Sequence, residues 1–326
     1  MSVDRTLYIL FKATPGEDDD RLVASGRVAD GSVVLRPREE VADLISFTAL
    51  QPPFEAQAVG LTGEGEVVYF FEAVSQREQI PGAGFASENA MKLGRMTKIL
   101  QIGNRLLALG YGGQVYMRTP SEGWRFLAGP KGSDDGSTNL VYFCAVAHKG
   151  RLYFGGTETK RFRSTAEIDA ASQAGDGRRL ARAILAAKVP DKAVVGAYDG
   201  SWSQVDFDHP GTVVEMLEAG RSIEIFTTNG RIVSTPDFQE FNDVFAFGKK
   251  KSFWDIKGTE RGILVYFDGT LFRWTGEMEP FEPPLPGVDE SFINVSGYAG
   301  FLAAFAPHQI YTLDEDDWGE VTYTLS

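Results

Sequence analysis

The chain has 326 residues, 43% of them apolar, and its 32 basic and 45 acidic side chains give a formal charge of −13. This composition is that of a globular protein with enough apolar residues for a sizeable core, and it excludes a disordered chain. The negative charge opposes binding of DNA or RNA, because neutralising phosphates requires concentrated Lys and Arg. The 36 Gly and 15 Pro residues indicate many tight turns.

Cysteine content and hydropathy limit the classes of protein further. Cys144 is the single cysteine, so no internal disulfide and no cysteine-based metal cluster can form. It lies in an apolar run, where we interpret it as a small core residue and not as a nucleophile. No stretch approaches the roughly 18 consecutive apolar residues of a membrane span, and the first residues show no signal-peptide pattern. We therefore expect a cytoplasmic protein that binds neither membranes nor nucleic acid.

One strand pattern recurs along the chain. A short β-rich run is followed by a Gly-bearing turn, an apolar run, a second turn and an aromatic-rich run. Two fainter copies come first, over residues 7–36 and 58–74, and the clearest copy covers 97–127. Further copies begin at Tyr142, Val213, Phe253 and Phe292. Asn-Gly and Asp-Gly pairs in the second turns are typical of β-hairpins, because both residues accept positive φ at low cost.

The spacing of these copies predicts the architecture. The first-turn glycines are Gly103, Gly150, Gly220, Gly262 and Gly300, spaced by 38 to 47 residues except for one interval of 70. A four-stranded propeller blade needs about 40–50 residues, so we predict an all-β protein with one β-propeller domain over 1–326. The count favours seven blades, or six if the N-terminal strands complete the last blade. A two-sheet sandwich is the alternative, but it would not require one strand order to recur at this spacing.

Two segments resemble a known propeller repeat. Residues 115–124 end in Thr-Pro-Ser-Glu-Gly-Trp, which resembles the Asp-box, or BNR-type, repeat of Ser-x-Asp-x-Gly-x-x-Trp in a hairpin between outer strands. Residues 231–241 are similar but lack the glycine, and Ser164-Thr165 forms a third, shorter match. The resemblance implies a β-propeller and no particular activity. The arginine triad, tyrosine nucleophile and aspartate acid of Asp-box sialidases do not map onto this chain.

The β pattern is interrupted after Ser164, where we predict a helical insertion within a blade over 165–190. Residues 166–177 are expected to form a loop with at most one helical turn, and 178–188 a helix that ends before Pro190. An apolar stripe on this helix opposes a basic one, which consists of Arg178, Arg179, Arg182 and Lys188. The helix either caps a blade face or binds a partner, and in the second interpretation these four residues are the partner-binding residues.

No motif in the sequence points to catalysis or to a cofactor. The three histidines, His148, His209 and His308, each adjoin a predicted turn and lack a second ligand at metal-binding spacing. Neither a nucleophile elbow nor a phosphate-binding P-loop is present. Carboxylates are too numerous for any one acid–base pair to be chosen. We therefore assign no catalytic residue, no metal ligand and no cofactor.

These observations favour a non-enzymatic scaffold that binds another protein through loops on one face. A bacterial immunity protein that neutralises a toxin, or an adaptor of a secretion or regulatory complex, fits this interpretation. The alternative is a hydrolase or lyase that acts on a glycan or a lactone at the mouth of the central channel.

Overall fold

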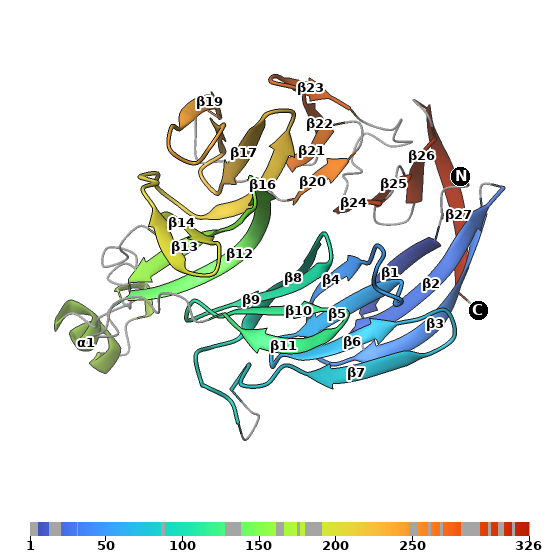
Figure 1. Cartoon of the computed structure of the whole chain (residues 1–326), viewed down its shortest axis with the longest axis horizontal. Helices are drawn as coiled ribbons and strands as arrows, with labels where there is room; N and C mark the ends of the chain where they lie inside the picture. Colours follow the sequence, from blue (N-terminus) through green and yellow to red (C-terminus); the bar gives the residue numbers. More distant parts are fainter. Residues whose placement is uncertain are drawn as a thin grey trace.

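The chain forms a ring of six β-sheets in the computed structural model (Figure 1). The structure describes residues 6–12, 21–30, 32–85, 89–127, 138–160, 166–174, 177–179, 191–247, 253, 255–259, 262–267, 270–281, 294–298, 301–305, 310–314 and 317–325. Each sheet contains one blade of four antiparallel strands that follow one another in the sequence. The prediction of an all-β propeller is therefore confirmed.

The strands of the six blades have the following bounds. Blade 1 contains β4 (Leu44–Ala49), β5 (Ala58–Thr62), β6 (Glu66–Phe70) and β7 (Ser75–Gln79). Blade 2 contains β8 (Met96–Ile102), β9 (Arg105–Gly110), β10 (Val115–Thr119) and β11 (Glu122–Phe126). Blade 3 contains β12 (Thr138–His148), β13 (Arg151–Lys160), β14 (Lys192–Tyr198) and β15 (Trp202–Val205). Blade 4 contains β16 (Val213–Ala219), β17 (Ser222–Thr227), β18 (Arg231–Thr235) and β19 (Asn242–Ala246). Blade 5 contains β20 (Asp255–Thr259), β21 (Gly262–Phe267), β22 (Thr270–Trp274) and β23 (Met278–Pro280). Blade 6 contains β24 (Asn294–Tyr298), β25 (Phe301–Phe305), β26 (Ile310–Asp314) and β27 (Asp317–Leu325).

The N-terminal strands do not form a seventh four-stranded blade, so the preference for seven blades was wrong. The strands β1 (Thr6–Lys12), β2 (Arg21–Ala29) and β3 (Ser32–Val41) form an antiparallel meander. Its last strand, β3, pairs in parallel with β27, so the three strands extend the sheet of blade 6. One face of the meander packs on blade 1 through Val23 and Val41, and the other packs on blade 6 through Val33 and Leu35. The meander therefore closes the ring between the last blade and the first.

Blades 1 to 4 are buried on both faces in the described part of the chain, which explains why their middle strands are nearly continuous apolar runs. Successive side chains of a strand point to opposite sides, and β9 shows the result clearly. Leu106 and Ala108 belong to the cluster shared with blade 1, whereas Leu107 and Leu109 belong to the cluster shared with blade 3. The same arrangement joins blades 3 and 4 and blades 4 and 5. The core of the protein is thus a series of apolar layers between neighbouring blades.

Chain direction divides the connections between two ends of the ring. Because the four strands of a blade alternate in direction, the connections from the second to the third strand lie at the same end as the connections between blades. We call this end the insertion face, since the long connection from β13 to β14 lies there. The hairpins between the first and second strands, and between the third and fourth, lie at the opposite end, which we call the hairpin face. Gly103, Gly150 and Gly220 occupy first-turn positions on the hairpin face, as their spacing predicted.

The described part of the connection from β13 to β14 contains a helix that begins earlier than the sequence indicated. Helix α1 (Ala166–Gln173) occupies the segment predicted as a loop with at most one turn. Its Ile168 and Ala171 are buried, and they lie three residues apart on one side of the helix. Residues 177–179 are also helical, and residues 180–190 lie outside the described part of the chain. Small helix-compatible residues and a buried apolar side explain why α1 forms despite its short, polar sequence.

Candidate functional site

Three large apolar side chains are exposed on the insertion face, where blade 1 joins blade 2. Phe85 and Met91 belong to the connection from β7 to β8, and Tyr111 belongs to the turn between β9 and β10. Their exposed fractions are 52%, 41% and 40%. We call these three residues the apolar patch. Large apolar side chains gathered at one place on a surface mark contact sites, whereas single ones carry no such meaning.

One backbone hydrogen bond joins the two segments of the apolar patch, and a second one lies within the connection from β7 to β8. The Tyr111 N–H donates to the carbonyl of Arg95 at 2.9 Å, and the Met91 N–H donates to the carbonyl of Gly82 at 2.8 Å. Gly94 has a φ of +131°, and a side chain there would collide with Tyr111. Glycine at this position therefore lets the connection pass close to Tyr111, whose side chain remains exposed.

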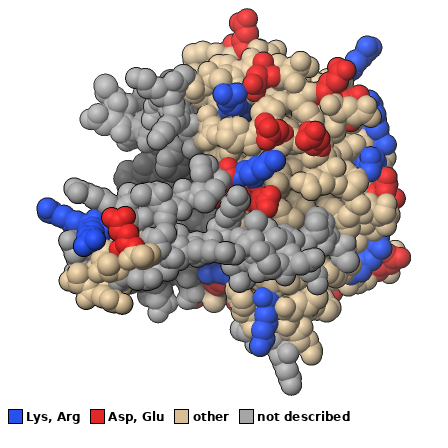
Figure 2. Space-filling model, turned by 90° about the vertical axis from the view of Figure 1, so that its left-hand side faces the viewer, with Lys and Arg blue, Asp and Glu red and all other residues tan. Residues whose placement is uncertain are grey.

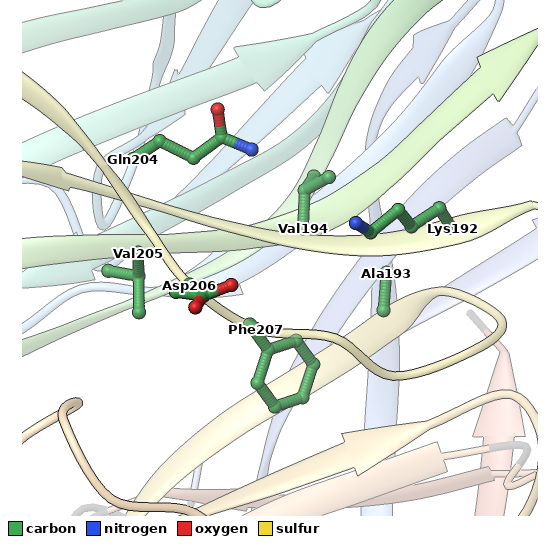
Figure 3. A pocket seen from close by; sticks show the side chains of 7 residues that line it. All are labelled: Lys192, Ala193, Val194, Gln204, Val205, Asp206 and Phe207. Atoms are coloured by element: carbon green, nitrogen blue, oxygen red, sulfur yellow. The ribbon is translucent and has the colours of Figure 1, made fainter.

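A small cavity lies on blade 3 where its outer strand ends. β15 pairs with β14 only from Val195 onward, and the chain returns to the start of β14 at Pro210, which forms an antiparallel bridge with Lys192. The chain beyond Val205 turns away and leaves a cavity of about 200 Å³ (Figure 3). The side chains of Lys192 and Asp206 point toward one another across this space, with Gln204 to one side. Lys192 Nζ also lies 3.5 Å from an Asp208 carboxylate oxygen.

The lining of this cavity determines the chemistry that it can support. Its described residues offer one ammonium, one carboxylate and one amide, and the other four are apolar. Such groups can hydrogen-bond a small polar ligand. The lining contains neither a pair of carboxylates nor a nucleophile with a neighbouring base, which hydrolytic mechanisms use.

A wider cleft of about 600 Å³ continues from this cavity between blades 3 and 4. It shares Gln204, Val205 and Asp206 with the cavity and extends to the hairpin that joins β18 to β19. Arg151 lines it, with its Nε 3.0 Å from a carboxylate oxygen of Asp199 and an Nη2–H that donates to the Ser203 hydroxyl at 3.0 Å. The cationic group of Arg151 is thus held within blade 3 and is not free for a ligand.

Both segments that resemble the Asp-box lie in equivalent places, the hairpins between the third and fourth strands of blades 2 and 4. In blade 4 a carboxylate oxygen of Asp237 accepts the Gln239 N–H at 2.9 Å, and the Thr235 hydroxyl accepts the Phe238 N–H at 2.8 Å. In blade 2 the Thr119 hydroxyl accepts the Glu122 N–H at 3.2 Å. These side chains satisfy backbone donors in the turn, so in this structure the segments shape hairpins. The third match, Ser164-Thr165, lies outside the described residues.

The structure describes two of the four predicted partner-binding residues. Arg178 and Arg179 are helical and exposed, whereas Arg182 and Lys188 lie outside the described residues. Figure 2 looks onto the side that carries α1 and shows basic and acidic side chains interspersed over the described surface. The two described arginines are therefore accessible to a partner.

The remaining candidate residues have structural roles in the described part of the chain. Cys144 is fully buried and its thiol donates to the carbonyl of Gly155 at 3.7 Å. His148 Nε2 lies 2.9 Å from the carbonyl oxygen of Pro236, and His209 lies 3.6 Å from a carboxylate oxygen of Asp243. His148, the last residue of β12, and His209, in the connection between blades 3 and 4, thus both contact blade 4. His308 lies outside the described residues.

The described part of the chain offers neither a metal-binding cluster nor a membrane-spanning helix. It contains no group of three or more His, Cys, Asp or Glu side chains that could hold a metal ion. None of its helices combines the length and the apolar character that crossing a bilayer requires.

Comparison with known proteins identifies the class. No protein-family model and no curated protein matches the sequence. The chain is similar to the solved structure of virginiamycin B lyase from Staphylococcus aureus, with a TM-score of 0.54 and 8% identity over 87% of this chain and 85% of that one. It is also similar to U3-55K, with a TM-score of 0.53 and 11% identity over 93% of this chain and 84% of that one. At these identities the likeness shows the fold alone. The chain is a six-bladed β-propeller, and these findings do not single out the Asp-box family.

Sequence reasoning did not find the apolar patch. Its residues lie in connections without hydrophobic periodicity, so no pattern separates an exposed aromatic residue there from a buried one. One signal of an exposed apolar site was present in the composition of residues 82–91. There Phe85 and Met91 stand among Gly, Ala, Ser and polar residues. Phe85 and Met91 lie outside any strand, so strand alternation does not direct their side chains into the core.

Proposed function

We propose that this propeller is a scaffold that binds another protein on its insertion face, with the apolar patch at the centre of the contact. The exposure of Phe85, Met91 and Tyr111 on adjoining loops carries this proposal. Aromatic residues and Met are enriched in the cores of protein interfaces, and few such anchors supply most of the binding energy. The blades beneath them are rigidly packed, so the loops meet a partner with little loss of conformational freedom.

The partner we propose offers an apolar surface for the patch and positive charge around it. The chain carries a formal charge of −13, which attracts a basic protein and accelerates its association. A toxin neutralised by an immunity protein, or a subunit held by a secretion or regulatory adaptor, fits this description. The helical insertion lies on the same face, and in this proposal Arg178, Arg179, Arg182 and Lys188 bind acidic side chains that the otherwise basic partner places opposite the insertion.

The experiment uses the full chain with an affinity tag. Proteins that co-purify at constant stoichiometry are identified, produced separately and recombined with the chain. The double variant Phe85→Ser/Met91→Ser is expected to weaken the reconstituted complex by about tenfold or more, because each hot-spot anchor contributes at least about 1 kcal/mol. Val74→Ser is the matched control, since Val74 is 56% exposed on the hairpin face. A complex that survives the double variant unchanged would overturn the proposed surface.

The role of the insertion is tested separately. Changing Arg178, Arg179 and Arg182 to Glu is expected to weaken the complex without affecting folding, because these substitutions replace attraction to the partner's acidic side chains with repulsion. If this triple variant binds as well as the wild type, the insertion has no part in recognition. Turnover by the free chain on a panel of glycans and lactones would instead support the hydrolase or lyase alternative.

A further inference from the structure

A groove of about 630 Å³ lies between the N-terminal strands and blade 1. Strands β2 and β3 form one wall, and Gln57 and Glu72 of blade 1 form the other. Glu72 belongs to the connection between β6 and β7, so the groove opens toward the hairpin face. It is therefore separate from the apolar patch, which lies on the insertion face.

Strand alternation brings arginines onto the wall that faces this groove. In the β2–β3 ladder Ser25 lies opposite Arg36, while Val28 lies opposite Val33 on the buried side. Arg27 therefore shares the exposed side with Ser25 and is a diagonal neighbour of Arg36, at a distance of about 7–8 Å between backbone positions. We call the space beside Arg27, Arg36 and Arg38 the arginine groove.

The arginine groove is open because the side chains between the arginines are small. Ser25, Ala29 and Ser32 line it and cannot reach across to blade 1. Elsewhere at the same junction Val23 and Val41 pack with Phe70 and fill the space. Val34 provides the apolar part of the groove, and it remains 51% exposed.

The charges of this groove are not neutralised within the described part of the chain. No hydrogen bond or ion pair involves the side chain of Arg27 or of Arg36 there, although both backbones pair in the sheet. Arg38 donates to the main-chain carbonyls of Phe71 and Glu72, which leaves its positive charge without a carboxylate partner. By contrast, six other described arginines pair with Asp or Glu, namely Arg77, Arg95, Arg118, Arg151, Arg231 and Arg273.

Unpaired like charges on neighbouring strands destabilise a sheet. An anionic ligand in the open space beside them would neutralise these charges and remove the repulsion. Arginine suits carboxylates in particular, because its planar donors match both oxygens. The described lining contains one carboxylate, Glu72, against three guanidinium groups. At physiological salt, charges more than about 8 Å away are largely screened, so the local arginines outweigh the acidity of the whole chain.

We propose that the arginine groove binds a short acidic segment of a protein, with carboxylates on Arg27 and Arg36 and an apolar side chain on Val34. The groove lacks the features that favour a nucleic acid. Its described lining has no aromatic residue on which a base could stack. A longer polyphosphate would extend over a chain with a formal charge of −13, whereas a short peptide confines its charge to the groove.

The test measures binding of two labelled, end-capped peptides to the full chain by fluorescence anisotropy. One peptide is Glu-Glu-Leu-Glu-Glu, and the other has Gln in place of each Glu. The acidic peptide is expected to bind at least about tenfold more tightly, with an affinity that falls as salt rises. In the variant Arg27→Gln/Arg36→Gln this preference is expected to fall about tenfold. Equal binding of both peptides by the wild type would overturn the proposal.

The control removes the same charge elsewhere. Arg105→Gln/Arg125→Gln alters two exposed arginines of blade 2, and it is expected to leave peptide binding unchanged. Equal losses in both variants would show that only net charge matters and would refute the groove. An oligonucleotide or inorganic phosphate that displaces the peptide at equal concentration would refute the choice of ligand. If Arg27→Gln/Arg36→Gln fails to fold, Arg36→Lys replaces it, and retained full affinity there would refute the carboxylate pairing.

Discussion

The rings of Tyr153 and Phe238 stack with their centroids 3.6 Å apart and their planes 7° from parallel, although they belong to different blades. Tyr153 lies on the second strand of blade 3, and Phe238 lies in the hairpin between the last two strands of blade 4. Both are buried, and Phe238 has a φ of +61°, a conformation that a bulky residue rarely adopts. The hairpin therefore holds an unfavourable backbone conformation in order to place this ring against the neighbouring blade.

A double-mutant cycle tests this contact. Phe238→Ala is expected to lower the free energy of unfolding by about 3–5 kcal/mol, because it removes a buried aromatic ring. Combined with Tyr153→Ala, it should show a coupling of about 0.5–1.5 kcal/mol, as aromatic pairs do. Urea denaturation of the four proteins gives the coupling. Tyr198→Ala is the control partner, since Tyr198 packs toward blade 2, and its effect should add to that of Phe238→Ala.

The same hairpin predicts a pH dependence. The N–H groups of Gln239 and Glu240 donate to the Asp237 carboxylate and hold its pKa below the usual value of 3.8. A lowered pKa in the folded state means that the carboxylate stabilises the fold above the unfolded pKa and ceases to do so as pH falls through the folded pKa. Asp237→Asn should therefore be less stable than the wild type at pH 6, and the difference should shrink below about pH 4.

Urea denaturation at pH 6 and pH 3 measures the effect of Asp237→Asn. Glu240→Gln is the control, because it removes the same charge from the same hairpin, and its side chain makes no hydrogen bond in the described part of the chain. A difference between wild type and Asp237→Asn that is equally large at both pH values would contradict the role of the ionised carboxylate.

Local signals predicted the repeating part of this fold and failed where distant segments meet. Gly103, Gly150 and Gly220 mark first turns because a positive φ selects glycine whatever surrounds it. The parallel pairing of β3 with β27 brings strands near the two ends of the chain together. The spacing of the repeated turns along the sequence gives no indication of this pairing. The blade count therefore depended on a contact that periodicity does not reveal.

The candidate surfaces were hidden for related reasons. Arg27 and Arg36 alternate with buried residues, and this pattern indicates only that one side of the strand is exposed. That they face an open groove depends on the distance to blade 1. The apolar patch similarly depends on the close approach of Tyr111 to Gly94. These two residues belong to different connections, and no sequence motif links them.

Cys144 should be unreactive in the folded protein. Burial raises the pKa of its thiol well above the usual value, Glu215 raises it further, and Lys98 partly opposes this shift. The reactive thiolate is therefore scarce, and reagents cannot reach the sulfur. At pH 8, a thiol-specific chromogenic reagent should label Cys144 of the native protein no faster than the protein unfolds. In denaturant the same reagent should label Cys144 promptly. Ser121→Cys supplies an exposed thiol as a positive control. Prompt labelling of native wild type would show that the junction of blades 3 and 4 opens.

Ring closure can be tested on two adjacent residues of β3. Leu35 is fully buried and packs with Ile310 and Val321 of blade 6, whereas the next residue toward the N-terminus, Val34, faces the arginine groove. Leu35→Ala should lower the free energy of unfolding by about 2–5 kcal/mol, and Val34→Ala should change it little. Without the Leu35 side chain the contact between the meander and blade 6 is weaker. Hydrogen exchange should therefore become faster in β1–β3 and β24–β27, while the exchange rates of blades 2 and 3 change less. Equal acceleration in all blades would mean that the ring opens as one cooperative unit, and that the meander is no weaker than the junctions between complete blades.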